Sequence, residues 1–362
     1  MEQIDEINNM HPYSFYPPEN FWKTGVAELD WEELCLKSKS KFKLATSDKI
    51  STAGSCFAQH IASHLNAVGL NHYIEEKAPY FMTKQRLEEL NYNVFSARYG
   101  NIYTVKQFRQ LIEFAFNVRR RSTVFAKTDL GYFDLLRPLI QPQGFGTLHD
   151  LECDREYHLN CVRKVFEGAS CFIFTLGLIE YWSDQNHDVA FPICPGTKIG
   201  VFDPSKHALN ISSYTETVHD LYWCIDFCRE VNPKMNWIFT VSPVALAATA
   251  QDQHVLLATS AAKSLLRAAL EEVCGQNINC EYFPSFEITS HIASKGAYLS
   301  PDKRNIAMSG VAHAMKEFKA TFMADDYHPV FEEPPAQHLV QNQIKQAATA
   351  ECDESFNDPR IV

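Results

Sequence analysis

The chain has 362 residues, of which 46% are hydrophobic and 21% charged, and its formal net charge is −11. This length can bury one large core or two modest ones, and the composition is that of a globular protein. The net negative charge argues against nucleic acid as a partner. The basic triplet Arg119–Arg121 is interpreted as a solvated helix face and not as a nucleic-acid patch. The first residues show no signal segment, and no apolar run is long enough to span a bilayer.

Residues 1–45 are rich in proline, aromatic and charged residues, and we expect them to form an N-terminal arm packed on the core. Residues 46–323 show the alternation of apolar and polar segments expected of one α/β domain. Residues 324–362 contain proline pairs, glutamine, alanine and acidic residues with little periodicity, which predicts a partly disordered C-terminal tail.

The central domain alternates between short apolar runs and amphipathic segments. Strands are predicted near residues 48–54, 171–176, 237–241 and 279–283. Helices are predicted near residues 57–65, 105–119, 152–167, 213–230, 259–274 and 307–322. An irregular aromatic stretch at 73–103, an insertion with short strands at 122–150 and a long loop before residue 213 complete the domain. Strands separated by helices predict a parallel sheet with helices on its faces.

The first predicted strand ends in the sequence Gly54-Ser55-Cys56, and an amphipathic helix follows at once. A helix N-terminus can hold negative charge, and the same field favours a thiolate. Two further buried strands end in turns of small or polar residues, at Gly177 and Ser242. Because the carboxyl ends of parallel strands share one edge of a sheet, we expect these three turns to meet in one crevice.

The segment Gly54–Ala58 resembles, letter for letter, the signature of the GSCFA-domain family. Further stretches resemble the same family: Ser96–Thr104, Thr175–Glu180, Pro195–Thr197, Thr240–Val244, Tyr282–Ser285 and Gly310–Val311. Together they span roughly residues 20–320. The family is similar in fold to the SGNH/GDSL hydrolase superfamily. The resemblance therefore implies a flavodoxin-like α/β fold of the SGNH type, ester chemistry, and a bacterial setting with a glycan or polysaccharide substrate.

In the superfamily the nucleophile is the third residue of Gly-Asp-Ser, and this register places Cys56 at the attacking position. A thioester would suit both acyl transfer to a sugar hydroxyl and hydrolysis. Distantly similar capsule-polysaccharide acetyltransferases carry a Gly-Asn-Cys turn at this place. Ser55 is the alternative nucleophile. The third possibility is structural: Ser55 caps the helix and Cys56 is a small buried hydrophobic residue.

The resemblance also implies donors for an oxyanion hole, which in acyl transfer stabilises the tetrahedral oxygen. Gly100 matches the second superfamily block and Gly177 matches the glycine of the third. The asparagine of the third block is replaced here by Ile179, and Asn101 could supply the missing donor. Glu180 either orients a base or binds substrate, or it pairs only with its neighbours.

The catalytic base is the part of the pattern that departs most from the superfamily. The Asp-x-x-His motif that precedes the last helix reads Asp302 to Asn305 here, so its histidine is absent. Four histidines are candidates instead, in this order: His254, His328, and then His60 and His313. His254 follows the third predicted strand, where the family tends to show a His-Val pair, and His328 ends a second Asp-x-x-His pattern.

The sequence therefore predicts an acyl-ester enzyme, either an esterase or an O-acyltransferase, that works through a covalent acyl intermediate. No metal site and no glycine-rich phosphate loop are predicted, and no cofactor is expected apart from acetyl-CoA as a donor if the enzyme is a transferase. Eleven scattered cysteines without a visible export signal favour reduced thiols in the cytoplasm. The alternative is a non-catalytic module on the same scaffold that binds an acylated glycan.

Overall fold

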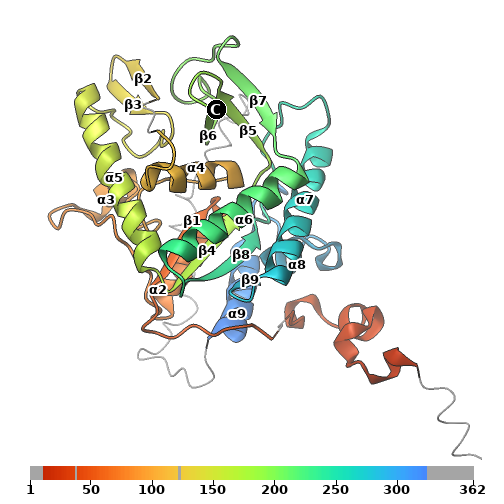
Figure 1. Ribbon diagram of the computed structural model, residues 1–362. Helices are drawn as coiled ribbons and strands as arrows, with labels where there is room; N and C mark the ends of the chain where they lie inside the picture. Colours follow the sequence, from red (N-terminus) through yellow and green to blue (C-terminus); the bar gives the residue numbers. More distant parts are fainter. Residues whose placement is uncertain (1–10, 37–38, 121–123, 324–362) are drawn as a thin grey trace, which may run out of the picture.

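The computed structural model describes residues 11–36, 39–120 and 124–323. At its centre lies a parallel sheet with the strand order β1-β4-β8-β9 (Figure 1). Its strands are β1 (Ile50–Gly54), β4 (Cys171–Leu176), β8 (Asn236–Val241) and β9 (Cys280–Tyr282). Gly54 pairs with Thr175, which pairs in turn with Thr240, so the carboxyl ends of three strands lie side by side. The predicted parallel α/β sheet is confirmed.

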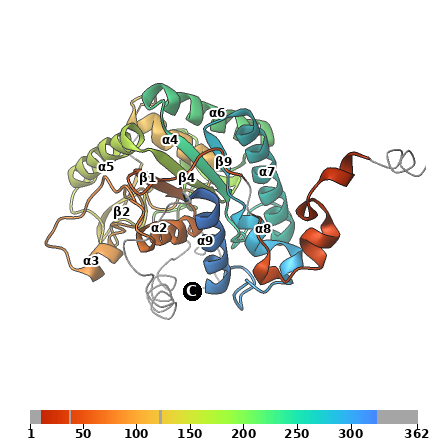
Figure 2. The same ribbon diagram turned by 90° about the horizontal axis from the view of Figure 1, so that it is seen from below.

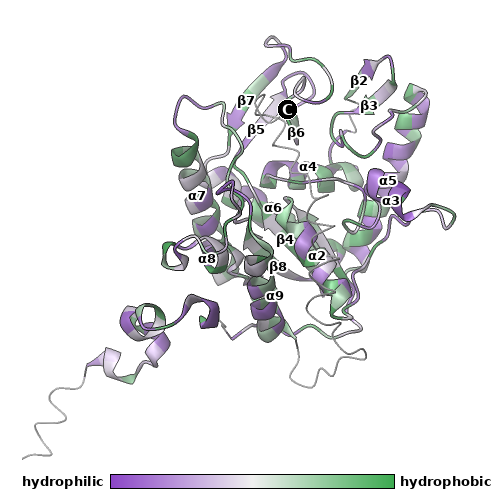
Figure 3. Cartoon of the chain, turned by 180° about the vertical axis from the view of Figure 1, so that it is seen from behind, coloured by the Kyte–Doolittle hydropathy of each residue, from purple (hydrophilic) through white to green (hydrophobic). Residues whose placement is uncertain are grey.

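Helices cover both faces of this sheet, as the view from below shows (Figure 2). One face carries α4 (Val105–Ala115), α5 (Leu148–Gly168), α6 (Tyr214–Val231) and α7 (Val255–Gln276). The other face carries α2 (Phe57–Ala67) and α9 (Met308–Phe322). These helices show both hydrophilic and hydrophobic colours in Figure 3, as expected for helices buried along one side.

Side chains that alternate along the strands supply a separate core to each face. Phe172 and Phe174 of β4 pack against the α4 side, where the ring of Phe108 stacks on Phe174 with 4.0 Å between centroids. Cys171 and Ile173 of the same strand pack toward α2 and α9. A strand buried on both faces reads as a continuous apolar run, which is why the sequence predicted it.

A second, antiparallel sheet was not predicted. It has the order β6-β5-β7 and consists of β5 (Glu180–Asp184), β6 (Val189–Phe191) and β7 (His207–Ile211). The prediction of a long loop here is therefore wrong. The strands lack a clear apolar pattern, because β5 and β7 are only half-buried and β6 has three residues. The short strands predicted in the insertion are confirmed as β2 (Phe125–Thr128) and β3 (Gly131–Asp134). Two further short helices are α3 (Lys84–Glu89) and α8 (Ser285–Ser290).

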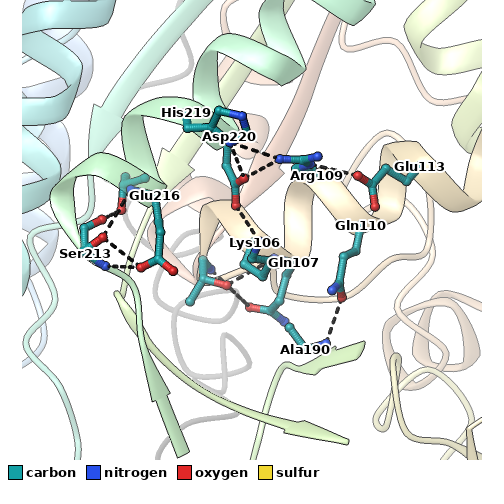
Figure 4. A network of polar contacts seen from close by, with 12 residues as sticks. Lys106, Gln107, Arg109, Gln110, Glu113, Ala190, Ser213, Glu216, His219 and Asp220 are labelled. Carbon is teal, nitrogen blue, oxygen red and sulfur yellow. Dashed lines mark hydrogen bonds and ion pairs between the residues drawn. The ribbon is translucent and has the colours of Figure 1, made fainter. Parts of the chain in front are cut away.

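Helix α4 ties this second sheet and α6 to the rest of the domain (Figure 4). The Gln110 Oε1 accepts a hydrogen bond of 2.8 Å from the backbone N–H of Ala190 in β6. The Arg109 guanidinium lies 2.8 Å from Glu113 on its own helix and 2.6 Å from Asp220 on α6. Because the carboxylates of Glu113 and Asp220 are almost fully buried, this network fixes the two helices more firmly than an exposed ion pair would.

The described part of the N-terminal arm consists of short helical turns at Pro12–Phe15, Pro18–Asn20, Lys23–Ala27 and Trp31–Glu33. It contacts the domain through Trp22 and Trp31, whose rings lie beside that of His291, and through Leu34, which is buried. The indole N–H of Trp31 also donates to the carbonyl of Ile288 over 3.2 Å. The first turn, at Pro12–Phe15, lies away from the domain (Figure 1). No helix in the described part of the chain is long and apolar enough to cross a membrane.

Candidate functional site

The turn after β1 has a backbone that favours glycine. Gly54 has φ +139°, and a Cβ atom there would lie 2.4 Å from the carbonyl oxygen of Thr175 on the neighbouring strand. The next N–H, that of Ser55, donates to the same carbonyl over 3.1 Å. Cys56 already has helical dihedrals, φ −53° and ψ −31°, and is the N-cap residue of α2. The predicted change from strand to helix therefore occurs within two residues.

Ser55 does not cap the helix, so that structural explanation of its presence is wrong. The N-cap position belongs to Cys56, and the start of α2 has no side-chain capping hydrogen bond. Ser55 is 2% exposed, and its hydroxyl has no hydrogen-bond partner among the described residues. A buried hydroxyl without a partner is uncommon in native proteins and is often explained by function.

Cys56 has apolar surroundings, packed in the same cluster as Phe57, Val244 and Val311. Its sulfur is disulfide-bonded, so in this state it is not a thiolate. Nine other described cysteines are free: Cys35, Cys153, Cys161, Cys171, Cys194, Cys224, Cys228, Cys274 and Cys280. The prediction of reduced thiols is thus confirmed for these nine and is wrong for Cys56. Cys56 can act as a nucleophile only after reduction.

The loop before α4 joins the turns that the sequence placed at one edge. The N–H of Ile102 donates to the carbonyl of Gly54 over 2.8 Å. The carbonyl of Tyr103 accepts from the N–H groups of Gly177 and Leu178, over 3.0 and 2.9 Å. The Ser242 N–H donates to the carbonyl of Leu176 over 2.8 Å, so the three predicted turns, after β1, β4 and β8, do lie side by side, and the Ile102 and Tyr103 loop joins the first two. However, the engaged N–H of Gly177 cannot serve as an oxyanion donor in this arrangement, which corrects that expectation.

A cavity of about 800 Å³ opens beside this edge, and Gly100 and Asn101 form part of its wall. Gly100 has φ +68°, and the backbone N–H groups of both residues have no hydrogen-bond acceptor in the described part of the chain. The Asn101 Oδ1 accepts from the Gln59 amide over 3.1 Å, which leaves the Asn101 Nδ2 as a further donor. Both residues thus keep the donor capacity predicted for them.

Helix α2 contributes His60 to the wall of the same cavity. Ser55 and Cys56 are not part of the wall and lie one turn before it. Cys56 and His60 are four residues apart, and residues with this spacing are neighbours on one helix face. Burial lowers the pKa of His60 to about 4, so its imidazole is neutral at pH 7 and can accept a proton. Of the three candidate histidines that the structure describes, His60, His254 and His313, His60 is the one that lines this cavity.

The structure places His254 elsewhere. His254 is exposed, is the N-cap of α7, and its Nδ1 accepts a hydrogen bond of 3.1 Å from the N–H of Leu256. It does not line the large cavity. The first-ranked base therefore has a structural task, and nothing in the geometry joins it to Ser55 or Cys56.

Glu180 pairs with the loop that precedes His254, which was one of the two expectations for it. Its carboxylate accepts from the Thr249 hydroxyl over 2.6 Å, the Ala250 N–H over 2.9 Å and the Gln251 amide over 2.8 Å. With three donors on its two oxygens, Glu180 anchors this loop to β5 and does not face a base.

The remaining base candidates are also accounted for. Both ring nitrogens of His313 are bonded, Nε2 to the carbonyl of Leu34 over 2.9 Å and Nδ1 to the Tyr298 hydroxyl over 2.8 Å. Asn305, where the resemblance led us to look for a histidine, donates to Asp302 over 2.6 Å within a local turn. His328 lies outside the described residues.

Sequence reasoning missed Lys263 of α7, which is 2% exposed. Its Nζ donates to the carbonyl of Gly177 over 2.7 Å, which places a buried cation behind the turn that contacts Ser55. The sequence gives no signal for this position, because Lys263 stands among alanine and leucine residues of an ordinary helix. Within the described ranges, no group of three or more His, Cys, Asp or Glu residues could hold a metal ion.

Comparison with known proteins identifies the family of this chain. The family model of the GSCFA family matches residues 49–318, which include both faces of the parallel sheet and every described part of the site. No curated protein matches the chain. Because the match covers most of the sequence, the chain belongs to the GSCFA family.

Proposed function

We propose that this protein is an acyl-ester enzyme, an esterase or O-acyltransferase, that forms a covalent acyl intermediate and acts on a glycan ester. The observation that carries the proposal is the edge of the parallel sheet, where the uncapped helix α2 follows Ser55 and Cys56 directly and its first turn leads to the wall of a large cavity. Gly100 and Asn101 line that cavity, and their N–H groups, which have no acceptor among the described residues, suit an oxyanion.

In the proposed reaction the reduced Cys56 thiol gives its proton to His60 and attacks the ester carbonyl. The carbonyl oxygen becomes negatively charged, and N–H groups of Gly100 and Asn101 donate to it. When the intermediate collapses, the alcohol leaves with the proton from His60, and a thioester remains. Water or a sugar hydroxyl then attacks the thioester, which releases the acyl product and restores the thiol. An acyl thioester such as acetyl-CoA would be the donor of a transferase.

Ser55 is the alternative nucleophile, favoured by its unpartnered hydroxyl. A serine route needs no reduction, whereas the cysteine route requires the disulfide at Cys56 to be opened. Comparing the protein with and without a reducing agent therefore separates the two routes before any substitution is made.

The test is acylation by an aryl acetate, followed by intact mass measurement. With reduced protein we expect one acetyl adduct, lost in Cys56→Ala, retained in Ser55→Ala, and formed at least tenfold more slowly in His60→Gln. His254→Gln should acylate at the parent rate. Cys153→Ala is the matched control for nonspecific reaction, because Cys153 is an exposed free thiol on α5.

A non-catalytic module that binds an acylated glycan is the second candidate, and the loss of the superfamily histidine at Asn305 favours it. This candidate predicts no adduct in the parent or in any variant. An adduct lost in Ser55→Ala but retained in Cys56→Ala would instead reassign the nucleophile.

A further inference from the structure

A small chamber of about 60 Å³ lies next to the large cavity. Four residues belong to the walls of both: Tyr99, Asn101, Leu136 and Arg137. The rest of the chamber wall comes mainly from α4, α5 and β6, including His158 and Ala190. This volume holds a few water molecules or one small polar group. A ligand in the large cavity could thus extend a substituent into the chamber past Asn101.

Two polar atoms of the chamber residues lack hydrogen-bond partners, although both side chains are more than nine-tenths buried. Arg137 is 5% exposed; its Nε donates to Asp134 over 3.0 Å and its Nη2 to Asp154 over 2.8 Å, while Nη1 has no partner. His158 is 1% exposed; its Nδ1 lies 2.6 Å from Glu76, while Nε2 has no partner. Leaving such buried groups unpaired is energetically unfavourable.

The protonation of His158 decides what each unpaired atom can do. Burial and the positive charge of Arg137 lower the pKa of His158, so its ring is neutral at pH 7. The contact with the Glu76 carboxylate places the single ring proton on Nδ1, which leaves Nε2 as an acceptor. The chamber thus offers one donor, on Arg137, and one acceptor, on His158.

Among the described residues, the charges around the chamber balance. Their buried network pairs three cations with three anions: Arg98, Arg137, Arg155, Glu76, Asp134 and Asp154. An additional ion would leave an uncompensated charge in a buried place, which is strongly unfavourable. The chamber therefore suits a neutral group that both accepts and donates a hydrogen bond.

We propose that the chamber binds a hydroxyl group of the alcohol part of the substrate, which accepts from Arg137 Nη1 and donates to His158 Nε2. The ligand class is a polyhydroxylated alcohol such as a sugar. This inference rests on the proposed function, because it assigns the alcohol subsite of the same cavity. A ligand held in this way spans from the chamber to the donors of Asn101.

Direct binding tests the inference without catalysis. Methyl glucoside is titrated into the full chain labelled with ¹⁵N-histidine, and the Nε2 signal of His158 is followed. We expect that signal to shift and to saturate as the nitrogen accepts a hydrogen bond. Absence of binding, or binding that leaves the His158 signal unmoved, overturns the inference.

A chamber-filling variant gives a second test that leaves the ion network intact. Ala190→Val adds two methyl groups to the chamber wall and should weaken methyl glucoside binding about tenfold. Ala208→Val on β7 of the same sheet is the matched control, because Ala208 does not line the chamber. Equal binding by parent and Ala190→Val would contradict the assignment.

The acylation test keeps this inference distinct from the proposed function. An aryl acetate has no polyol part, so the acetyl adduct of the parent protein reports the proposed function without the chamber. If no adduct forms in any protein, the proposed function fails even where the glucoside binds in the chamber. If the adduct forms but the glucoside does not bind, the chamber inference alone fails.

Discussion

The helices on the two faces of the sheet begin in different ways. On one face, α4, α5 and α6 each start with a complete capping box, in which a side chain and a backbone group satisfy each other. The pairs are Thr104 with Gln107, Thr147 with Asp150, and Ser213 with Glu216. On the other face, α2 starts without a side-chain cap, although a serine directly precedes its N-cap residue.

The capped starts of α4, α5 and α6 stabilise those helices, whereas the backbone N–H groups at the start of α2 have no side-chain cap. Gly54 turns the chain so that the Ser55 N–H faces Thr175, and the Ser55 hydroxyl is left without a partner. The amide dipoles at the start of α2 are consequently not neutralised by a capping oxygen. An uncapped helix start beside a cavity is suited to hold negative charge that develops during a reaction.

The largest expected effect is the loss of the turn itself. Gly54→Ala should reduce the free energy of unfolding by about 3 kcal/mol or more, because its Cβ would overlap the Thr175 backbone at a positive φ. Urea denaturation measures this. The matched control is Gly275→Ala in α7, where a Cβ meets nothing within 4 Å, and it should stabilise by about 0.5–1 kcal/mol. Equal effects would show that the turn tolerates a side chain.

An intermediate effect is expected from His60 as the pH falls. Burial lowers the pKa of His60 to about 4, so the unfolded chain binds this proton more readily than the folded one. Stability from the neutral ring is complete above the unfolded value of about 6.5 and is lost toward pH 4. His60→Gln should therefore flatten the stability profile between these values, by at most about 1.4 kcal/mol per pH unit. The pH dependence of stability should not vanish in His60→Gln, because burial also lowers the pKa of His72 to about 4.

Urea denaturation of both proteins at several pH values checks this expectation. An unchanged slope after His60→Gln would mean that the folded state does not disfavour the protonated ring. Such a result would also weaken the assignment of His60 as a neutral base.

The smallest effect compares the two kinds of helix start directly. Thr104→Ala removes a cap that accepts from the Gln107 N–H over 3.2 Å, and it should cost about 1 kcal/mol. Ser55→Ala removes a hydroxyl that has no partner and should be neutral or slightly stabilising. Thermal unfolding at one pH measures both. A loss of similar size in Ser55→Ala would reveal a structural role for that hydroxyl.

Much of the parallel sheet can be predicted because burial on both faces leaves a continuous apolar run. Cys171–Leu176 is the clearest case. The antiparallel sheet could not be predicted in this way, since Glu180–Asp184 mixes acidic, aromatic and polar residues and is only half-buried. Its pairing depends on the distant strand His207–Ile211, and a local pattern does not contain such a partner.

For the site, position along the chain predicted the turns, whereas Gly100 and Asn101 were proposed as donors from the family resemblance. The turns at Gly54, Gly177 and Ser242 follow from where strands end, and they lie side by side. His254 was ranked first because of its place in the chain, but its ring is used to cap a helix. His60 carried a usable signal, its spacing of four residues from Cys56. The pairing of His158 with Glu76 joins residues that are 82 positions apart, and nothing in the sequence links them.

The hydrogen bonds that join the Ile102 and Tyr103 loop to β1 and β4 have a consequence for folding. The three segments are far apart in the chain, so the bonds from Ile102 to Gly54 and from Gly177 to Tyr103 form only once the sheet is assembled. These two amide protons should exchange with solvent only through global opening, as slowly as those in the middle of β4. The Ile102 and Tyr103 loop beside the candidate site would then belong to the part of the protein whose amide protons exchange most slowly with solvent.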